Sequence, residues 1–303
     1  MFSKPPVVFN TRVEIDLPDR IQLYIKREDR IHPSISGNKY RKLKYNSIEA
    51  QRKKQSRLLT FGGAFSNHIA AVAAMGKAYG FKTIGIIRGE ELQYKISENP
   101  TLTYAQECGM KLKFISRNEY RHKTDPLFLE SLEAEFGEFY LLPEGGTNDL
   151  AVQGCEEILT ETDKQFDVIC CPAATGGTLA GLINSTADCQ YVLGFSVLKG
   201  DFLKDDICKF VNKTNWEVLT RYHFGGYARV NSELIGFINN FKKKTNIPLD
   251  PVYTGKMMYG VMELIKEGYF KKDIKILVIH TGGLQGIAGM NLKLEQKQLP
   301  KII

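Results

Sequence analysis

Short apolar runs alternate with amphipathic stretches along the chain from residue 57 onward. The apolar runs predict buried strands, and the stretches between them have the spacing of amphipathic helices. Strands are expected at 57–61, 82–88, 111–116, 139–143, 166–173, 190–197 and 273–283. Helices are expected at 66–80, 99–109, 125–137, 149–162, 177–186, 231–245 and 254–268. Strands separated by helices of this length predict β-α-β units with parallel strands.

This alternation predicts an α/β protein of two lobes that face one another, each lobe a mostly parallel twisted sheet flanked by helices. The smaller lobe is expected at residues 42–142. It is inserted into a larger lobe that both chain ends build, from 1–41 and 143–303. A chain of 303 residues is long enough for two such lobes.

Composition narrows the class of protein. Hydrophobic residues make up 43% of the chain and charged residues 25%, which is typical of a soluble globular protein. The first ten residues lack the apolar segment of a signal peptide, and no apolar run approaches the roughly 18 residues of a membrane helix. Six cysteines without a C-x-x-C motif indicate reduced thiols in the cytoplasm, and Cys170 and Cys171 are expected in the core.

The net charge of +7 comes largely from basic runs at 52–57 and 242–244. No aromatic residue is interleaved in either run, so a solvated surface is favoured over nucleic-acid binding. A small anionic ligand fits the charge equally well. Five histidines are scattered without the spacing of metal ligands. We therefore expect a small-molecule substrate, and neither nucleic acid, membrane nor metal as a partner.

Glycine-rich segments follow four of the predicted strands and read GGAFSNH, EGGTND, AATGGTLAGL and TGGLQG. Ligands of open α/β sheets bind beyond the carboxyl ends of the strands, where glycine lets backbone N–H groups come close. The third segment is the best phosphate site, because it lies between a strand and a helix N-terminus. Its binding residues would be Thr175, Gly176, Gly177 and Thr178. A plain strand-to-helix turn is the alternative.

One lysine stands in an unusual setting, in the stretch HPSISGNKYRK. Gly37 allows a close approach of the backbone, Asn38 can hydrogen-bond, and Lys39 supplies an amine. A site for one phosphate, an isolated lysine and the lack of a metal site favour pyridoxal 5′-phosphate, whose aldehyde condenses with a lysine amine. Taken alone, Lys39 is better interpreted as a surface residue, as most lysines are.

Together these segments resemble a known family. GNKYRKL, GGAFSNHIAAVAA, PEGGT, TGGTLAGL, DPVYTGK and HTGG occur in the order and at the spacings of the 1-aminocyclopropane-1-carboxylate deaminase / D-cysteine desulfhydrase family, over about residues 8–290. Members of this family are pyridoxal-phosphate enzymes of fold type II, the tryptophan-synthase-β-like fold. The resemblance implies this fold, this cofactor and, by analogy, a homodimer.

Matching the motifs residue by residue assigns roles in the site. Lys39 would form the Schiff base and carry the proton at the substrate α-carbon, and Asn67 would bond the phenolic oxygen of the cofactor. Ser66 would hold the substrate carboxylate or assist proton transfer. Tyr253 and Tyr227 match two tyrosines that face the substrate, although the sequence around Tyr227 fits the family loosely. The Thr-Gly-Gly-Thr segment would bind the phosphate.

Two positions separate the branches of the family. The deaminases resemble DPVYEGK and HLGG, with a glutamate near the pyridine nitrogen, whereas this chain has Thr254 and Thr281, as the desulfhydrases do. A carboxylate keeps that nitrogen protonated and makes the strong electron sink that opening a cyclopropane requires. A neutral hydroxyl donates to an unprotonated nitrogen, and the weaker sink suffices for β-elimination. His68 also follows the desulfhydrase pattern SNH.

The expected reaction is β-elimination of D-cysteine to pyruvate, sulfide and ammonia. The amine of Lys39 would remove the α-proton as a neutral base, favoured by desolvation and by the cations Arg41 and Lys42, and a tyrosine would act as acid. Cyclopropane deamination and elimination from another D-amino acid are the alternatives within the family. Ala174, Phe65 and the residues after PEGG depart from the family pattern, which leaves the substrate side chain open. Outside the family, the alternative is a non-catalytic protein that binds a phosphorylated metabolite.

Overall fold

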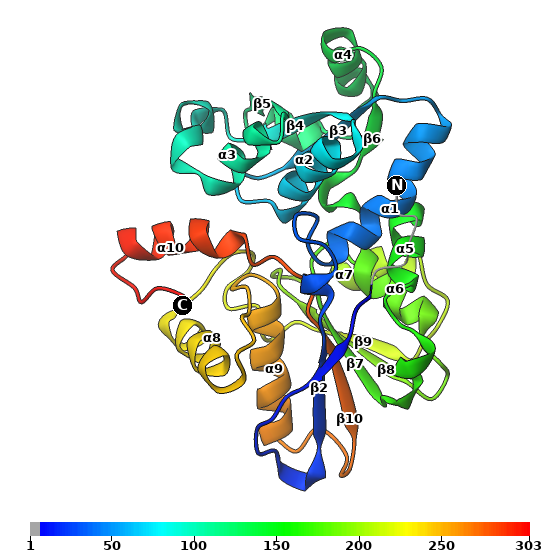
Figure 1. The fold of residues 1–303 in the computed structure, drawn as a ribbon, viewed down its shortest axis with the longest axis vertical. Coiled ribbons are helices and arrows are strands. Elements are labelled where there is room, and N and C mark those ends of the chain that lie inside the picture. Colours follow the sequence, from blue (N-terminus) through cyan, green and yellow to red (C-terminus); the bar gives the residue numbers. More distant parts are fainter. Residues whose placement is uncertain (1–6) are drawn as a thin grey trace.

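The computed structural model describes residues 7–303 and contains two α/β lobes, which lie one above the other in Figure 1. The larger lobe is built on a six-stranded sheet with the strand order β1-β2-β10-β7-β8-β9. Its strands are β1 (Asn10–Arg12), β2 (Gln22–Lys26), β7 (Val168–Ala173), β8 (Tyr191–Ser196), β9 (Trp216–Leu219) and β10 (Lys275–Ile279). β1 pairs antiparallel with β2, and the other neighbouring strands pair in parallel.

The smaller lobe contains a four-stranded parallel sheet with the order β5-β4-β3-β6. Its strands are β3 (Arg57–Gly62), β4 (Lys82–Arg88), β5 (Lys111–Ile115) and β6 (Tyr140–Leu142). The helices between them are α2 (Asn67–Tyr79), α3 (Pro100–Glu107) and α4 (Pro126–Phe136). Ser66, Asn99 and Asp125 each accept backbone hydrogen bonds at the first turn, which explains where these helices begin.

Both faces of the larger sheet are covered, which explains why its strands read as unbroken apolar runs. The covering helices are α5 (Asp149–Glu156), α6 (Gly177–Ser185) and α7 (Leu203–Cys208) on one face, and α8 (Ser232–Thr245), α9 (Thr254–Lys266) and α10 (Gly286–Gln296) on the other. Along β7, Cys170 packs on the side of α8 and α9, and Cys171 packs on the side of α5 and α6. Both cysteines are fully buried, which confirms their expected place in the core.

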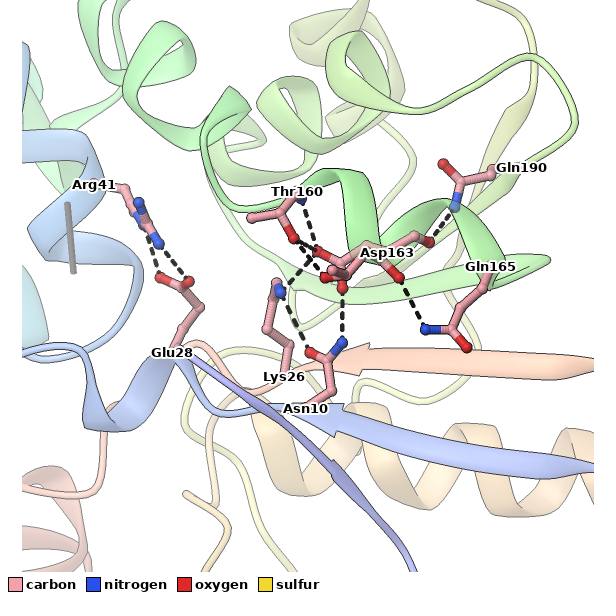
Figure 2. Close-up of polar contacts among 9 residues, drawn as sticks. Asn10, Lys26, Glu28, Arg41, Thr160, Asp163, Gln165 and Gln190 are labelled. Carbon is pink, nitrogen blue, oxygen red and sulfur yellow. Dashed lines mark hydrogen bonds and ion pairs between the residues drawn. The ribbon is translucent and has the colours of Figure 1, made fainter. Parts of the chain in front are cut away.

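Helix α1 (Asn38–Arg52) runs between the two lobes, seen in blue in Figure 1. Its first turn is held to the larger lobe by Arg41, whose guanidinium donates to both carboxylate oxygens of Glu28 at 3.0 and 2.9 Å (Figure 2). Both side chains are buried. A bidentate pair fixes orientation as well as distance, so the helix that carries Lys39 has a defined direction.

The predicted α/β fold with mostly parallel sheets is confirmed, and each strand and helix expected from residue 57 onward is present. The pattern did not predict α1, β1, β2, α7, β9 or α10. Helix α1 was missed because its buried positions Tyr40, Leu43, Ser47 and Ala50 include a serine and are surrounded by charged residues.

The proposed division at residues 42 and 142 stays a prediction. The N-terminal segment judged to lack a signal peptide includes residues 1–6, which lie outside the described part of the chain. Among the helices of residues 7–303, none has the length and apolar character needed to cross a membrane.

Candidate active site

A cavity lies where helix α1 meets the loops that follow the strands. All four glycine-rich segments contribute to its wall, the first through Asn67, the second through Gly145, the third through residues 174–176 and 178, and the fourth through Thr281 and Gly282. Asn38, Lys39, Lys42 and Tyr253 complete the part of the wall that carries polar side chains. The structure therefore brings Lys39 and the predicted phosphate segment to one site.

Gly37 is required for the turn that precedes Lys39. Its φ angle is +62°, and a Cβ at this position would lie 1.9 Å from the carbonyl oxygen of Thr281, so an L-residue does not fit. The next residue, Asn38, donates its backbone N–H to that same oxygen at 3.2 Å. Its side-chain amide donates to Thr178 Oγ1 at 2.8 Å, which joins the lysine turn to the phosphate segment.

The amine of Lys39 is half-buried at the cavity wall and donates to the carbonyl oxygen of Gly145 at 3.1 Å. Burial holds the pKa of Lys39 well below its usual range, and the charge of Lys42 lowers it further. The expectation that Arg41 also contributes is wrong, because its guanidinium is paired with Glu28. A lysine with a lowered pKa is poised to act as a neutral base.

Lys42 is a residue of the site whose binding role the sequence did not predict. Its Nζ donates to Thr147 Oγ1 at 2.9 Å, to the Gly145 carbonyl at 3.2 Å and to Thr175 Oγ1 at 3.4 Å. A Cβ at Gly177 would lie 3.3 Å from this amine, so the glycine leaves room beside it. The signal was present: Lys42 follows Lys39 by three residues and therefore shares its helix face.

The N-terminus of α6 adds to this positive site. No side chain caps α6, whose preceding residue Gly176 has a φ angle of +76°. The N–H groups of an uncapped first turn, together with the helix dipole, favour a bound anion. Thr175 is exposed to the cavity side and Thr178 is buried behind it. Lys42 thus lies beside the N-terminus of α6, and both favour a bound anion.

The start of α2 carries Ser66 and Asn67. Ser66 Oγ accepts from the backbone N–H groups of His68 and Ile69 at 3.2 and 3.3 Å, which leaves its hydroxyl proton free to donate. Asn67 Oδ1 accepts from Gln285 at 2.6 Å, so its amide group keeps two donors. Both residues are half-buried, and Asn67 lines the cavity.

His68 lies behind this helix start and is 1% exposed. Neither ring nitrogen has a hydrogen-bond partner among the described residues. Burial holds the pKa of His68 well below its usual range, and the charges of Lys39 and Lys42 lower it further. The imidazole is therefore neutral, and it packs against Gly146, where a Cβ would lie 2.7 Å from Cε1.

The two predicted tyrosines form a pair. Tyr253, which directly precedes α9, donates to the hydroxyl of Tyr227 at 3.2 Å. Burial raises the pKa of both phenols, so both keep their protons at neutral pH. The loop before Tyr227 is held by Lys256 of α9, whose Nζ donates to the carbonyls of His223 and Gly226 at 2.8 Å each. Burial lowers the pKa of Lys256 to about 8.

The two predicted threonines have different settings. Thr254 is fully buried, donates its hydroxyl proton to Asp250 Oδ1 at 2.8 Å and accepts from the Asp250 backbone N–H at 2.8 Å. Its single proton is therefore committed to Asp250. Thr281 lines the cavity, and no partner of its hydroxyl is present among the described residues. Of the two, Thr281 is the one placed to donate to a ligand.

A family model described as pyridoxal-phosphate dependent enzyme matches residues 5–191. The chain belongs to this family. A Thermotoga maritima protein, provisionally named as a 1-aminocyclopropane-1-carboxylate deaminase, is 31% identical over 90% of this chain and 92% of its own length. The Arabidopsis thaliana mitochondrial enzyme named as bifunctional D-cysteine desulfhydrase/1-aminocyclopropane-1-carboxylate deaminase is 32% identical over 89% of this chain and 74% of its own.

Solved structures of the pyridoxal-phosphate enzymes agree with the fold. A crystal structure described as an ACC deaminase homologue superposes with a TM-score of 0.80 at 27% identity, covering 97% of this chain and 96% of that one. An O-acetylserine dependent cystathionine β-synthase from Helicobacter pylori superposes with a TM-score of 0.68 at 13% identity, covering 92% of each chain, and supports the fold alone. Fold type II, the cofactor and membership of the deaminase/desulfhydrase family are confirmed.

The residues present fit pyridoxal phosphate. Lys39 offers an amine with a lowered pKa inside the cavity. Lys42 is a buried cation that contacts only hydroxyl and carbonyl oxygens within the described residues, beside the uncapped α6 terminus. A buried charge of this kind needs a negative partner, which a phosphate would supply. Gly145 and Thr147 are therefore site residues that sequence reasoning missed, and for Lys42 it missed the binding role.

Proposed function

We propose that this pyridoxal-phosphate enzyme catalyses β-elimination from a small amino acid, with D-cysteine converted to pyruvate, sulfide and ammonia. The observation that carries the proposal is the chemistry of the polar side chains in the cavity wall, which are hydroxyl, amide and amine groups; among the described residues no carboxylate lines this wall. Asp250, which lies behind Thr254, is occupied by three backbone N–H groups and one hydroxyl at 2.7–3.0 Å. A site of this kind suits a moderate electron sink and a good leaving group.

When bound, pyridoxal phosphate supplies the electron sink for the charge left at the substrate α-carbon. Lys42, Thr175 and the α6 N-terminus would hold its phosphate, and Asn67 would donate to its phenolic oxygen. Lys39 removes the α-proton, because desolvation and Lys42 favour its neutral amine. The same amine then holds that proton until it is returned to the product or to solvent.

Ser66 and the first turn of α2 are the proposed site of the substrate carboxylate, since the hydroxyl proton of Ser66 is free and the helix dipole favours an anion. The tyrosine pair reaches the cavity through Tyr253, which lines its wall. Tyr227 is the proposed acid for the leaving thiolate, and Tyr253, which donates to it, would restore its proton. Both phenols remain protonated at neutral pH, as an acid must.

Deamination of 1-aminocyclopropane-1-carboxylate is the second candidate, because the relatives named above carry that activity in their names. The two reactions share Lys39 as base and differ in the electron sink they need. For the cellular setting we propose the cytoplasm, consistent with six cysteines that are all free. A homodimer is proposed by analogy with the family.

The deciding experiment compares products from purified holoenzyme given D-cysteine, L-cysteine and 1-aminocyclopropane-1-carboxylate. We expect pyruvate and sulfide from D-cysteine, at a kcat/KM well above that for 2-oxobutanoate from the cyclopropane. Equal or faster cyclopropane turnover would replace the first candidate by the second. Lack of an aldimine absorption band after adding pyridoxal phosphate would contradict the site itself.

A further inference from the structure

Residues 140–148 lead from β6 of the smaller lobe past the cavity and into α5. The middle of this segment meets the two lysines of the site. The Gly145 carbonyl accepts from the amines of Lys39 and Lys42 at 3.1 and 3.2 Å. Thr147 Oγ1 accepts from Lys42 at 2.9 Å. The position of the segment therefore helps to set the positions of both amines.

Two glycines make the middle of this segment conformationally permissive. Gly145 and Gly146 have φ angles of +69° and +72°, and glycine reaches many other conformations at little steric cost. Such a pair keeps one conformation only when contacts hold the residues on either side of it. Both ends of residues 140–148 are bonded to the same side chain, that of Asn46 on α1.

Asn46 is 1% exposed and uses both donors and both acceptors of its amide. Its Oδ1 accepts from Tyr140 at the start of the segment, at 3.2 Å, and from Asn148 Nδ2 at its end, at 2.8 Å. Its Nδ2 donates to Asn148 Oδ1 at 3.1 Å and to the backbone carbonyl of Lys42 at 2.8 Å. The side chain thus ties both ends of residues 140–148 to the helix turn that carries Lys42.

The chemistry of this position calls for an amide. Asn148 Oδ1 also accepts from the backbone N–H of Ala151 at 2.9 Å, in the first turn of α5, which fixes the orientation of its amide. The bond to the Lys42 carbonyl fixes the amide of Asn46 in the same way. Held like this, the two amides form a reciprocal pair in which each donates to the other. A carboxylate or an apolar group at position 46 would lose at least two of these bonds.

Close helix packing carries the effect of this pair to the phosphate site. A Cβ at Gly154 of α5 would lie 2.1 Å from the Arg41 carbonyl of α1, and a Cβ at Gly181 of α6 would lie 2.5 Å from Cys155 Cβ of α5. Helix α5 is therefore in close contact with both α1 and α6 (Figure 1). Because interiors packed this closely transmit displacements, a shift at Asn148 would change the distances between α1 and the N-terminus of α6.

We propose that Asn46 is a positioning residue for the cofactor phosphate. It is not part of the cavity wall and acts through its two bonds to Asn148. Those bonds keep Thr147 Oγ1 at 2.9 Å from the amine of Lys42 and at 2.6 Å from Thr175 Oγ1. The proposal rests on the proposed phosphate site at Lys42, and it does not depend on which amino acid the enzyme uses.

The test compares the affinity of the apoprotein for pyridoxal phosphate with that for pyridoxal, which lacks the phosphate, by fluorescence titration. The ratio of the two Kd values is a phosphate preference in which effects on the rest of the cofactor cancel. In N46L we expect this preference to fall by about 3-fold to 10-fold, the range for lost neutral hydrogen bonds. In N148S it should fall by a similar factor, although α5 keeps its cap because serine caps a helix as well as asparagine does.

Q190L is the matched control. Gln190 is a buried amide of the larger lobe that donates to the backbone carbonyls of Asp163 and Phe166 at 2.9 Å each, and it is not part of the cavity wall. This variant should lose stability in urea and keep the full phosphate preference. An equal fall in Q190L would refute the proposal, because the loss of any buried amide would then have this effect. An unchanged preference in N148S would refute it as well, and N148S decides alone if N46L does not fold.

Lys42→Met separates this proposal from the phosphate site on which it rests. If the preference falls in Lys42→Met but not in the Asn46 and Asn148 variants, the phosphate lies at Lys42 and the positioning role of Asn46 is refuted. If Lys42→Met keeps the full preference, the phosphate is bound elsewhere and both proposals fail. Neither result bears on the choice between D-cysteine and the cyclopropane, which product analysis decides.

Discussion

Two lysines of this protein are buried to the same extent, 2% exposed each, and have opposite surroundings. Lys26, on β2, lies 2.8 Å from Asp163 and within reach of Asn10 (Figure 2). Lys42, on α1, contacts only hydroxyl and carbonyl oxygens within the described residues. A buried charge is stable only when it is paired. The charge of Lys26 is paired within the protein, whereas the charge of Lys42 requires an anionic ligand.

The Lys26 region is a closed network. Asp163 accepts from Asn10 and from the backbone of Thr160 at 2.7 Å each, and Gln190 bonds the backbone carbonyl of Asp163 (Figure 2). Burial opposes ionisation of Asp163, but the bonds from Lys26 and Asn10 outweigh it and lower its pKa. The comparison teaches that burial alone does not mark a functional lysine; a missing counter-charge at the wall of the cavity does.

The largest effect is expected from Lys39→Ala, which removes the proposed base from the cavity that Lys42 also lines. Loss of the base should lower kcat/KM by about 10²-fold to 10⁴-fold or more. Borohydride treatment followed by mass spectrometry should show cofactor attached covalently to wild type and not to the variant. Lys53→Ala, at the exposed end of the same helix, is the control. Covalently attached cofactor in the Lys39 variant would mean that another amine forms the bond to the cofactor.

The next largest effect is expected from Asp163→Asn, which tests the structural side. Removing one partner of a buried pair leaves the charge of Lys26 without its counter-charge and destabilises by about 3–5 kcal/mol. Urea unfolding should show this loss, while the cofactor Kd of the folded protein stays unchanged. Glu161→Gln, in the same segment but in an exposed pair, should change stability by less than about 1 kcal/mol. A similar loss of stability in both variants would show that the buried Lys26–Asp163 pair stabilises the fold no more than an exposed pair does.

Lys42→Met tests whether the buried lysine without a counter-charge binds the cofactor phosphate. The variant should weaken pyridoxal-phosphate binding by about 10-fold to 100-fold, because a charged hydrogen bond to the phosphate is lost. Fluorescence titration of apoprotein measures the change. Lys256→Met is a demanding control, since Lys256 is also buried and also contacts carbonyl groups, but outside the cavity. Equal loss of cofactor affinity in both variants would show that any buried lysine has this effect.

The smallest effect is a dependence of apoprotein stability on pH. Burial lowers the pKa of Lys42 in the folded state from 10.5, its usual value. Between the lowered pKa and 10.5 the unfolded chain holds more protons, so stability rises with pH, by at most about 1.4 kcal/mol per pH unit. Lys42→Met should therefore be more stable than wild type at neutral pH, and the difference should shrink toward pH 10. A difference in urea midpoint that grows with pH would contradict this sign.

The sequence was sufficient for features that depend on neighbours along the chain. Apolar periodicity identified the strands from residue 57 onward, and four glycine-rich strand ends indicated one ligand site. The Gly37 turn was also interpreted correctly, because a positive φ and a close backbone approach are local requirements. The resemblance between motifs and family then supplied the cofactor, which the comparisons confirm.

Only the tertiary structure decided which side chains meet. Lys42 lies beside Thr147, 105 positions later, and Asn38 donates to Thr178, 140 positions later. Arg41 was expected as a second cation near Lys39, but its guanidinium is paired with the carboxylate of Glu28. Thr254 was expected to serve the cofactor, yet its proton is given to Asp250. Periodicity and turn chemistry act over a few residues, whereas the partner of a charge is set by how strands far apart in sequence are ordered in the sheets.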